Sequence, residues 1–192
     1  MEEINPTEAV GPSSPPTPKK RSVVGALVHW LRDLLFSVVL AVIVILFLYQ
    51  PVKVEGTSMM PSLEDQERIF VNKFVYRLEP IQRGDIIVFR YPRDPSKSFI
   101  KRVIGLAGDH IQIDAGRVFV NSKPIDEEYV PRSYEDERSY AEIIVPPDSY
   151  FVLGDHRSLS NDSRDFGPVG QSYIYGKAVF GYWPMDKMGR VR

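Results

Sequence analysis

The sequence predicts a mainly β domain preceded by one transmembrane helix, and three observations support this fold class. A run without charged residues extends from Leu34 to Tyr49 and contains only Ser37 as a polar interruption. After Pro51, clusters of β-branched and aromatic residues are separated by Gly, Pro, Asn and Asp, which is typical of strands joined by turns. No long stretch of helical periodicity follows Pro51, so we expect little helix beyond the anchor.

The composition limits the classes of function. The 192 residues carry a formal net charge of −1 and include no cysteine. A charge near zero provides no field for holding nucleic acid, and the lack of cysteine excludes disulfides, thiolate metal sites and a cysteine nucleophile. His110 and His156 are the only histidines after the apolar run, and neither belongs to a zinc-type spacing. We therefore expect no metal, no other cofactor and no nucleic-acid partner.

The N-terminal part is expected to consist of a tail and an anchor. Residues 1–21 are predicted to be a disordered cytoplasmic tail, because the stretch up to Pro18 is rich in Pro, Ser, Thr and Glu and has few large apolar side chains. Residues 22–51 are assigned to the transmembrane anchor region. A spanning helix needs about 20 residues, so we expect the span to begin near Trp30 and to end before Pro51.

Two alternatives for the apolar run are a cleavable signal peptide and a buried helix of a globular domain. A signal peptide would be followed by a small-x-small cleavage site, which Tyr49-Gln50-Pro51-Val52 does not offer. A globular helix would be apolar on one face, whereas residues 38–48 are apolar on every face. We therefore expect a retained anchor and a lipid bilayer as partner.

The charges around the anchor predict its orientation. Four basic residues precede the span: Lys19, Lys20, Arg21 and Arg32. By the positive-inside rule, the N-terminus of this single-pass protein is cytoplasmic and residues 52–192 form an extracytoplasmic domain. The membrane would be the cell membrane, or the thylakoid membrane if the source is photosynthetic.

Several strands can be placed within residues 52–192. The segments with strand-like patterns are Ile86–Phe89, Ile111–Asp114, Val118–Asn121, Tyr150–Leu153 and Ala178–Trp183. The first is apolar throughout, as a strand buried on both faces would be. The second and third predict a hairpin with the three-residue loop Ala115-Gly116-Arg117. Residues 125–141 are acidic and loop-like, and we expect a solvated face there.

The first candidate site segment is Gly56-Thr57-Ser58-Met59-Met60-Pro61-Ser62-Leu63, immediately after the anchor. Two methionines that we expect to be exposed, beside a serine, a glycine and a proline, are unusual in a linker, so the segment indicates a site loop. The pattern alone is weak, because Gly-x-Ser is common and Met60 stands where a nucleophile elbow has glycine. A strand-to-turn connection is the structural alternative.

The second segment, residues 98–109, places Lys101 among apolar residues on an expected strand. Alternation directs Lys101 and Arg102 to opposite faces, so one of them must face inward. A lysine acting as a base must lose its proton, and burial promotes this by penalising the ammonium form. Arginine stays charged and cannot take this part.

The third segment, residues 154–164, is a dense polar loop that follows an expected buried strand. Taken alone it would be a surface turn. The three segments together contain a candidate nucleophile, a candidate base and a loop rich in hydroxyl groups, which favours a functional site over the structural alternatives for each segment.

These segments resemble type I signal peptidases, the family of Ser/Lys proteases that removes signal peptides from exported preproteins. The resemblance covers the anchor and essentially all of residues 52–183. Four ordered blocks carry it: Gly56-x-Ser58-Met59-x-Pro61-x-Leu63, residues 84–89, residues 101–109, and Gly154-Asp155-x-Arg157-x-x-Ser160-x-Asp162-Ser163-Arg164. It implies a mainly β signal-peptidase-like fold with a small β insertion at about 115–145. It also implies preproteins as substrates, no cofactor, and cleavage after small residues at −1 and −3 through an acyl-enzyme.

The resemblance also implies roles for individual residues. Ser58 would be the nucleophile and Lys101 the general base, with Ser160 orienting the lysine by a hydrogen bond. The backbone N–H of Ser58 would be one oxyanion donor, and Gly56 or Thr57 is a candidate for the second, because Gly56 stands where the family often has a serine. The remaining implied positions are the pocket residues Val54, Ile100 and Met59 and the supporting residues Asp155, Asp162 and Arg164.

One departure from the family pattern suggests a rival mechanism. His156 replaces a common asparagine, so Ser58 with His156 and Asp155 or Asp162 forms an alternative triad. We expect instead that His156 is a partly exposed loop residue. Two other function classes share some of these features. A soluble self-cleaving repressor would carry a DNA-binding motif in place of the span, and a non-catalytic membrane-tethered module would tolerate changes at Ser58 and Lys101.

Overall fold

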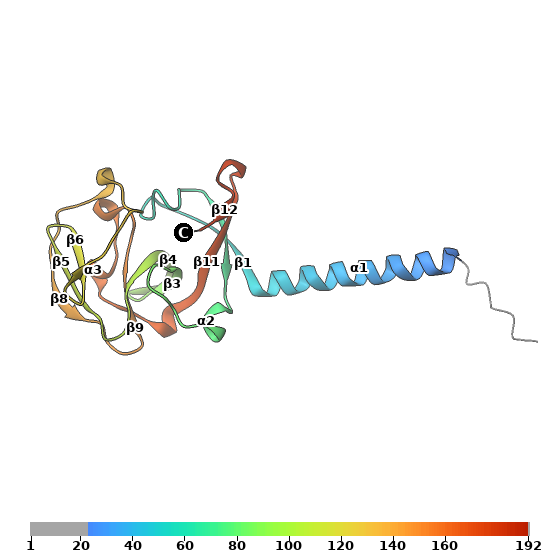
Figure 1. The fold of residues 1–192 in the computed structure, drawn as a ribbon, viewed down its shortest axis with the longest axis horizontal. Coiled ribbons are helices and arrows are strands. Elements are labelled where there is room, and N and C mark those ends of the chain that lie inside the picture. Colours follow the sequence, from blue (N-terminus) through green and yellow to red (C-terminus); the bar gives the residue numbers. More distant parts are fainter. Residues whose placement is uncertain (1–22, 192) are drawn as a thin grey trace, which may run out of the picture. The chain divides into compact units, whose positions relative to one another are not determined.

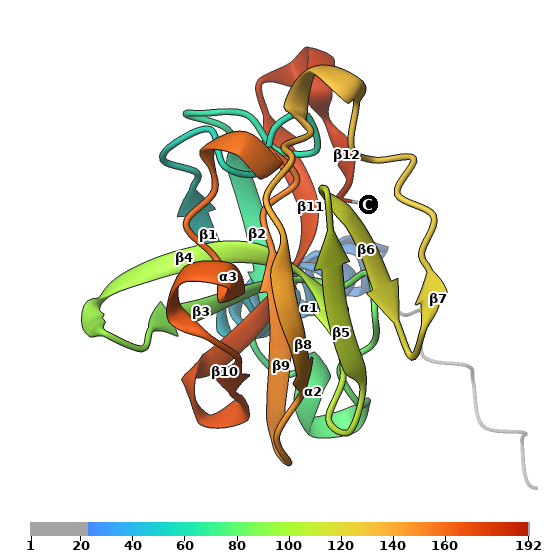
Figure 2. The same cartoon turned by 90° about the vertical axis from the view of Figure 1, so that its left-hand side faces the viewer.

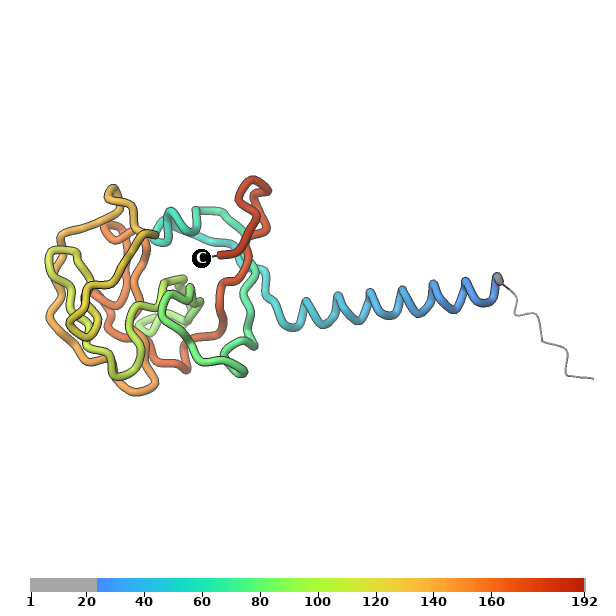
Figure 3. The backbone as a smooth tube through the Cα atoms, viewed as in Figure 1, coloured from blue at the N-terminus to red at the C-terminus, as the bar shows by residue number. Residues whose placement is uncertain are grey.

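A computed structural model describes residues 23–191, so the tail expected at residues 1–21 lies outside the described part of the chain. Helix α1 covers Val23–Leu48, and its regular coil is visible in Figure 3. Val24–Leu48 contains an 18-residue stretch with a mean hydropathy of 2.6 and is long and apolar enough to cross a membrane. The helix begins at Val23, before Trp30, where the membrane span was expected to begin. A helix can extend beyond the apolar span, since helical structure does not require that every turn be apolar. It ends before Pro51, where a strand has already begun.

The remainder is mainly β, as the sequence predicts (Figure 1). The larger sheet has the strand order β1-β2-β11-β3-β4-β9-β10, and β12 also pairs with β11. Its strand pairings among the described residues are all antiparallel. Its strands are β1 (Tyr49–Lys53), β2 (Arg68–Asn72), β3 (Ile86–Tyr91), β4 (Asp94–Gly105), β9 (Ser149–Leu153), β10 (Val169–Gly170), β11 (Ile174–Trp183) and β12 (Gly189–Arg190). Two short helices, α2 (Val75–Leu78) and α3 (Ser163–Phe166), complete this part.

A second sheet has the order β7-β6-β5-β8, and Figure 2 shows its strands beside one another. They are β5 (His110–Asp114), β6 (Arg117–Val120), β7 (Lys123–Pro124) and β8 (Tyr140–Ile144). Strands β6, β7 and β8 lie within the stretch where an insertion at about 115–145 is expected, whereas β5 precedes it, and the bounds of the insertion stay a prediction.

The predicted three-residue hairpin loop is wrong. Asp114 pairs directly with Arg117, which leaves a two-residue loop between β5 and β6. Ala115 and Gly116 both have positive φ, 44° and 79°, as a type I′ turn requires. This turn matches the right-handed twist of the strands, so Arg117 belongs to β6 and pairs with Asp114.

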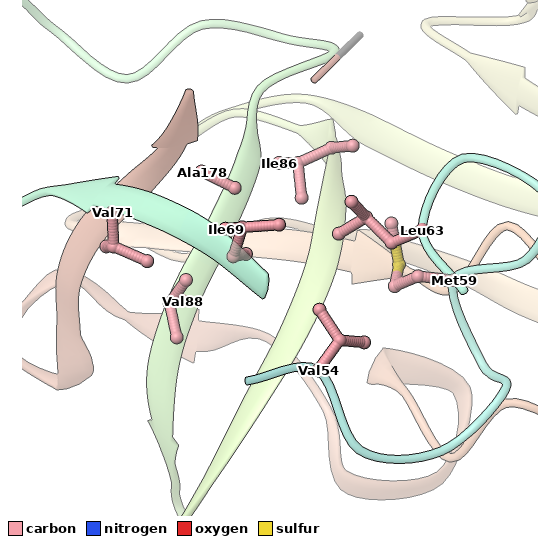
Figure 4. Packing of buried hydrophobic residues seen from close by; sticks show 8 residues of the cluster. All are labelled: Val54, Met59, Leu63, Ile69, Val71, Ile86, Val88 and Ala178. Atoms are coloured by element: carbon pink, nitrogen blue, oxygen red, sulfur yellow. The ribbon is translucent and has the colours of Figure 1, made fainter. Parts of the chain in front are cut away.

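Three clusters of buried apolar side chains form the core. All four residues of 86–89 are buried, which confirms a strand covered on both faces. Ile86 and Val88 lie in one cluster and Ile87 and Phe89 in another, because successive side chains point to opposite faces. Figure 4 shows the first of these clusters, to which the loop between β1 and β2 also contributes.

Candidate active site

The Ser58 loop connects β1 to β2 and is fixed by apolar side chains. Met59 and Leu63 point into the same core as Ile86 (Figure 4). The expectation that both methionines are exposed is wrong, since Met59 is buried and Met60 is half-buried. The burial of Met59 holds the loop to the sheet. Gly56 has φ 92°, a conformation that favours glycine. Ser58 is half-buried in this anchored loop.

Lys101 lies on β4, opposite Ile87 of β3. Its side chain is only 3% exposed, and its Nζ is within hydrogen-bond distance of Ser58 Oγ, at 2.6 Å. The Phe99 ring lies 5.5 Å from Nζ. Burial lowers the pKa of Lys101 from 10.5 to about 8, although the charges of Asp162 and Asp155 oppose this. A neutral amine at this position is therefore accessible near neutral pH.

Arg102 is also buried, so both faces of this stretch of β4 are covered, whereas alternation required only that one of the two basic residues face inward. The guanidinium donates two hydrogen bonds, of 2.8 and 2.7 Å, to the carboxylate of Asp155. It also donates to Ser62 Oγ and lies 4.0 Å from the ring centroid of Tyr129. A charged group with a bidentate partner tolerates burial, which the strand pattern alone does not predict.

The loop that follows β9 lies against the Ser58 loop at Gly154. A Cβ atom at this position would collide with Ser160 Oγ and with the carbonyl oxygen of Ser58, so only glycine fits. Two residues further, the backbone N–H of His156 donates to the same Ser58 oxygen at 3.1 Å. The sequence segments that contain Ser58 and Ser160 therefore meet at one backbone contact.

Asp162 and Arg164 form an ion pair within this loop. Arg164 donates two hydrogen bonds of 2.8 Å to the two carboxylate oxygens. Burial raises the pKa of Asp162, but the pairing with Arg164 outweighs it and holds the pKa below its usual range. Asp162 also caps α3 by accepting from the Arg164 backbone N–H. The carboxylate therefore remains ionised near Lys101.

Ser160 is 5% exposed, and its Oγ has no hydrogen-bond partner among the described residues. The expected hydrogen bond to Lys101 is not formed in this structure. The orienting role of Ser160 stays a prediction.

The groups of the rival triad are engaged elsewhere. His156 is buried rather than partly exposed, because its ring packs on Tyr134 and its Nδ1 lies 3.3 Å from the carbonyl oxygen of Thr57. Asp155 is bound to Arg102, as described above. Within residues 23–191, no hydrogen bond joins His156 to Ser58 Oγ.

The candidate oxyanion donors differ in availability. The N–H of Gly56 donates to Asp65 at 2.8 Å and is therefore occupied. In the described part of the chain, the backbone N–H groups of Ser58 and Thr57 have no acceptor. These two groups are therefore available, and their role as oxyanion donors stays a prediction.

The three expected pocket residues share one apolar cluster. Val54 and Met59 belong to its buried core, whereas Ile100 is only half-buried and packs against it. Ile100 therefore offers the most accessible surface of the three. No group of metal ligands of sufficient size occurs in the part of the chain that the structure describes.

Two residues near the site were missed because residues 125–141 were interpreted as a solvated face. That interpretation is wrong for Glu127 and Asp136, which pair with Arg157 and Arg164 and have side chains only 15% and 10% exposed. Within residues 154–164, two arginines are matched by two aspartates, so the sequence gives no charge imbalance that would point to Glu127 and Asp136.

Comparisons with known proteins identify the family. A family model described as signal peptidase, peptidase S26, matches residues 27–183. A signal peptidase I of Leptolyngbya laminosa is 36% identical, covering 99% of this chain and 96% of that protein. A probable signal peptidase I-2 of Synechocystis is 37% identical, covering 83% of this chain and 76% of that protein. A crystal structure of a signal peptidase I from Enterococcus faecalis is 31% identical with a TM-score of 0.46, covering 52% of this chain and 97% of that one.

The family model matches most of the chain, and the first two relatives exceed 30% identity over most of their own length. The chain belongs to the peptidase S26 family of signal peptidases, which are serine proteases that remove signal peptides from preproteins.

Proposed function

We propose that this chain cleaves signal peptides from exported preproteins with a dyad of Ser58 as nucleophile and Lys101 as general base. The observation that carries the proposal is the 2.6 Å separation between Lys101 Nζ and Ser58 Oγ, combined with the burial of the amine. A pKa of about 8 leaves about one tenth of Lys101 neutral at pH 7 and more at higher pH.

In the proposed reaction, neutral Lys101 accepts the hydroxyl proton of Ser58 while Oγ attacks the carbonyl carbon of the −1 residue. The backbone N–H of Ser58, with that of Thr57 as the candidate second donor, stabilises the oxyanion that forms. Lys101 then gives its proton to the leaving amine as the peptide C–N bond breaks, which leaves an acyl-enzyme on Ser58. Water, deprotonated by Lys101, hydrolyses this ester and releases the signal peptide.

The substrate segment is proposed to bind in an extended conformation beside β4. Strand β4 pairs with β3 over most of its length but with β9 only from Arg102 onward. The stretch before Arg102 therefore has one edge without a strand partner in the described residues, next to Lys101. An extended peptide can add to such an edge. The half-buried Ile100, with Val54 and Met59 beneath it, favours small side chains at −1 and −3.

The proposed topology follows from the charges around the span. The basic residues before α1 favour a cytoplasmic N-terminus, and residues 52–192 then form the extracytoplasmic catalytic domain. The proposed location is the cell membrane, or the thylakoid membrane in a photosynthetic source. Confinement of enzyme and preprotein to one bilayer raises their effective concentration.

The proposal is tested by cleavage of a preprotein by the full chain in detergent. We expect Ser58→Ala and Lys101→Ala to abolish cleavage and His156→Ala to retain it. Full activity of Lys101→Ala would exclude the dyad, and loss of activity only in the serine and histidine variants would favour the triad. A non-catalytic tether would show no cleavage in any form, including wild type.

A further inference from the structure

The segment between β7 and β8, residues 125–139, contains acidic residues in two different environments. Four of them are exposed: Asp126, Glu128, Glu135 and Glu137. Glu127 instead turns inward to pair with Arg157 of the loop after β9, and Asp136 to pair with Arg164 at the start of α3. Removing an ion from water is costly unless a partner compensates, so these two positions are not ordinary surface acids.

Glu127 is connected to the site through Arg157. The Arg157 guanidinium donates two hydrogen bonds to the carboxylate of Glu127, at 2.9 and 2.5 Å. Its Nε donates to the backbone carbonyl oxygen of Gly154 at 3.0 Å. Because the Arg157 side chain is 4% exposed, water does not readily replace Glu127 as its partner.

Asp136 is connected to the site through Arg164. The Arg164 guanidinium donates to Asp136 at 2.7 Å and, by its other nitrogens, to both oxygens of Asp162. Asp162 in turn accepts a hydrogen bond of 3.1 Å from the backbone N–H of Gly154. This second series of contacts therefore ends at the same residue as the first.

The two series of contacts thus end at a single residue, Gly154. The one through Arg157 holds its carbonyl group, and the one through Arg164 and Asp162 holds its N–H group. The surroundings of this residue are closely packed, since a Cβ atom there would meet Ser160 and the Ser58 carbonyl oxygen. A shift of Gly154 would displace Ser58 relative to Lys101, and a misplacement of about 1 Å can lower a rate by about a hundredfold.

We propose that Glu127 and Asp136 are positioning residues that fix Gly154 through Arg157 and Arg164, and thereby hold Ser58 at its distance from Lys101. This inference rests on the proposed function, in which Ser58 and Lys101 carry the reaction. It assigns to the segment between the strands of the smaller sheet a part in catalysis without contact with the substrate.

The test is steady-state cleavage of a preprotein by the full chain in detergent. We expect Asp136→Ala and Glu127→Gln to lower kcat by about 10- to 100-fold with little change in KM, since neither residue contacts the proposed substrate edge. Asp136→Glu keeps the charge and should recover part of the loss. Glu137→Ala removes an exposed acid one position away and is the matched control, expected to cleave like wild type.

The pH profile distinguishes positioning from loss of folded protein. The charged groups that face Lys101 are Asp155, Asp162 and Arg164, and burial is the largest influence on its pKa. Loosening the loop admits water to the amine, so the acidic limb of kcat in Asp136→Ala should move to higher pH. A variant that is only partly unfolded would have a lower kcat at every pH, without a shift of this limb. A thermal melt measures the folded fraction directly.

The inference is overturned if Asp136→Ala and Glu127→Gln match Glu137→Ala in kcat, or if kcat falls while the acidic limb stays in place. Should Asp136→Ala fail to fold, Asp136→Asn takes its place and is judged by the same two criteria. Ser58→Ala separates the two proposals. If it is inactive while the carboxylate variants are normal, only the positioning inference fails, whereas an active Ser58→Ala removes the proposed function itself.

Discussion

Replacing Lys101 with methionine is expected to abolish cleavage and, at the same time, to stabilise the folded domain. Methionine is similar in length, flexible and uncharged, so it can occupy the same surroundings without desolvating an ammonium group. In the wild type, burial lowers the pKa of Lys101 from 10.5 to about 8. The folded state therefore carries a free-energy cost whenever it holds this lysine protonated.

The size of this cost follows from the pKa. The difference between 10.5 and about 8 corresponds to about 3 kcal/mol, at about 1.4 kcal/mol for each unit of pKa. Since the folded pKa is the lower one, the unfolded chain binds more protons between about pH 8 and pH 10.5, and wild-type stability rises with pH across this window. The advantage of Lys101→Met should be about 3 kcal/mol at pH 7 and about 2 kcal/mol at pH 9.

The assay is urea unfolding of the full chain in detergent at both pH values, followed by tryptophan fluorescence. Lys123→Met removes the charge of an exposed lysine and is the control, expected to change stability little at either pH. Lys101→Met could instead raise the free energy of unfolding equally at pH 7 and pH 9, or lower it at pH 7. Either result would refute the argument that a desolvated ammonium group destabilises the folded domain.

Three further outcomes are expected. The kcat of wild type should rise with pH along a limb of apparent pKa near 8, because only neutral Lys101 accepts the proton; a rate independent of pH between 6 and 9 would contradict this. Arg102→Leu should lower the free energy of unfolding by about 3–5 kcal/mol, since it leaves the buried Asp155 carboxylate unpaired. Urea unfolding measures this loss, and a second change, Asp155→Leu, should restore part of it. Gly154→Ala should lower kcat more than it lowers stability, because the added methyl group collides with Ser160 and the Ser58 carbonyl oxygen; unchanged kcat would show that this contact is unimportant.

Features that depend on neighbouring residues in the chain could be predicted from the sequence. Hydropathy predicted one long apolar helix, an uninterrupted apolar run predicted the strand at Ile86–Phe89, and the two-residue alternation predicted those at Ile111–Asp114 and Val118–Asn121. The family motifs singled out Ser58 and Lys101, whose side chains lie within 2.6 Å although 43 positions separate them. Their catalytic roles stay predictions. The hairpin loop was misjudged by one residue, since the twist of the paired strands selects the turn type.

Only the tertiary structure decided which polar residues are buried and what they pair with. Arg102, Glu127 and Asp136 resemble surface charges in sequence, yet each has an opposite charge supplied by a distant segment. Periodicity reports which face of an element a residue lies on, but the free energy of burying a charge depends on the partner that the fold brings to it. For this reason, the sequence by itself determined the fold class and the candidate nucleophile and base, whereas the surroundings that lower the pKa of Lys101 and hold Gly154 in place arose only from packing.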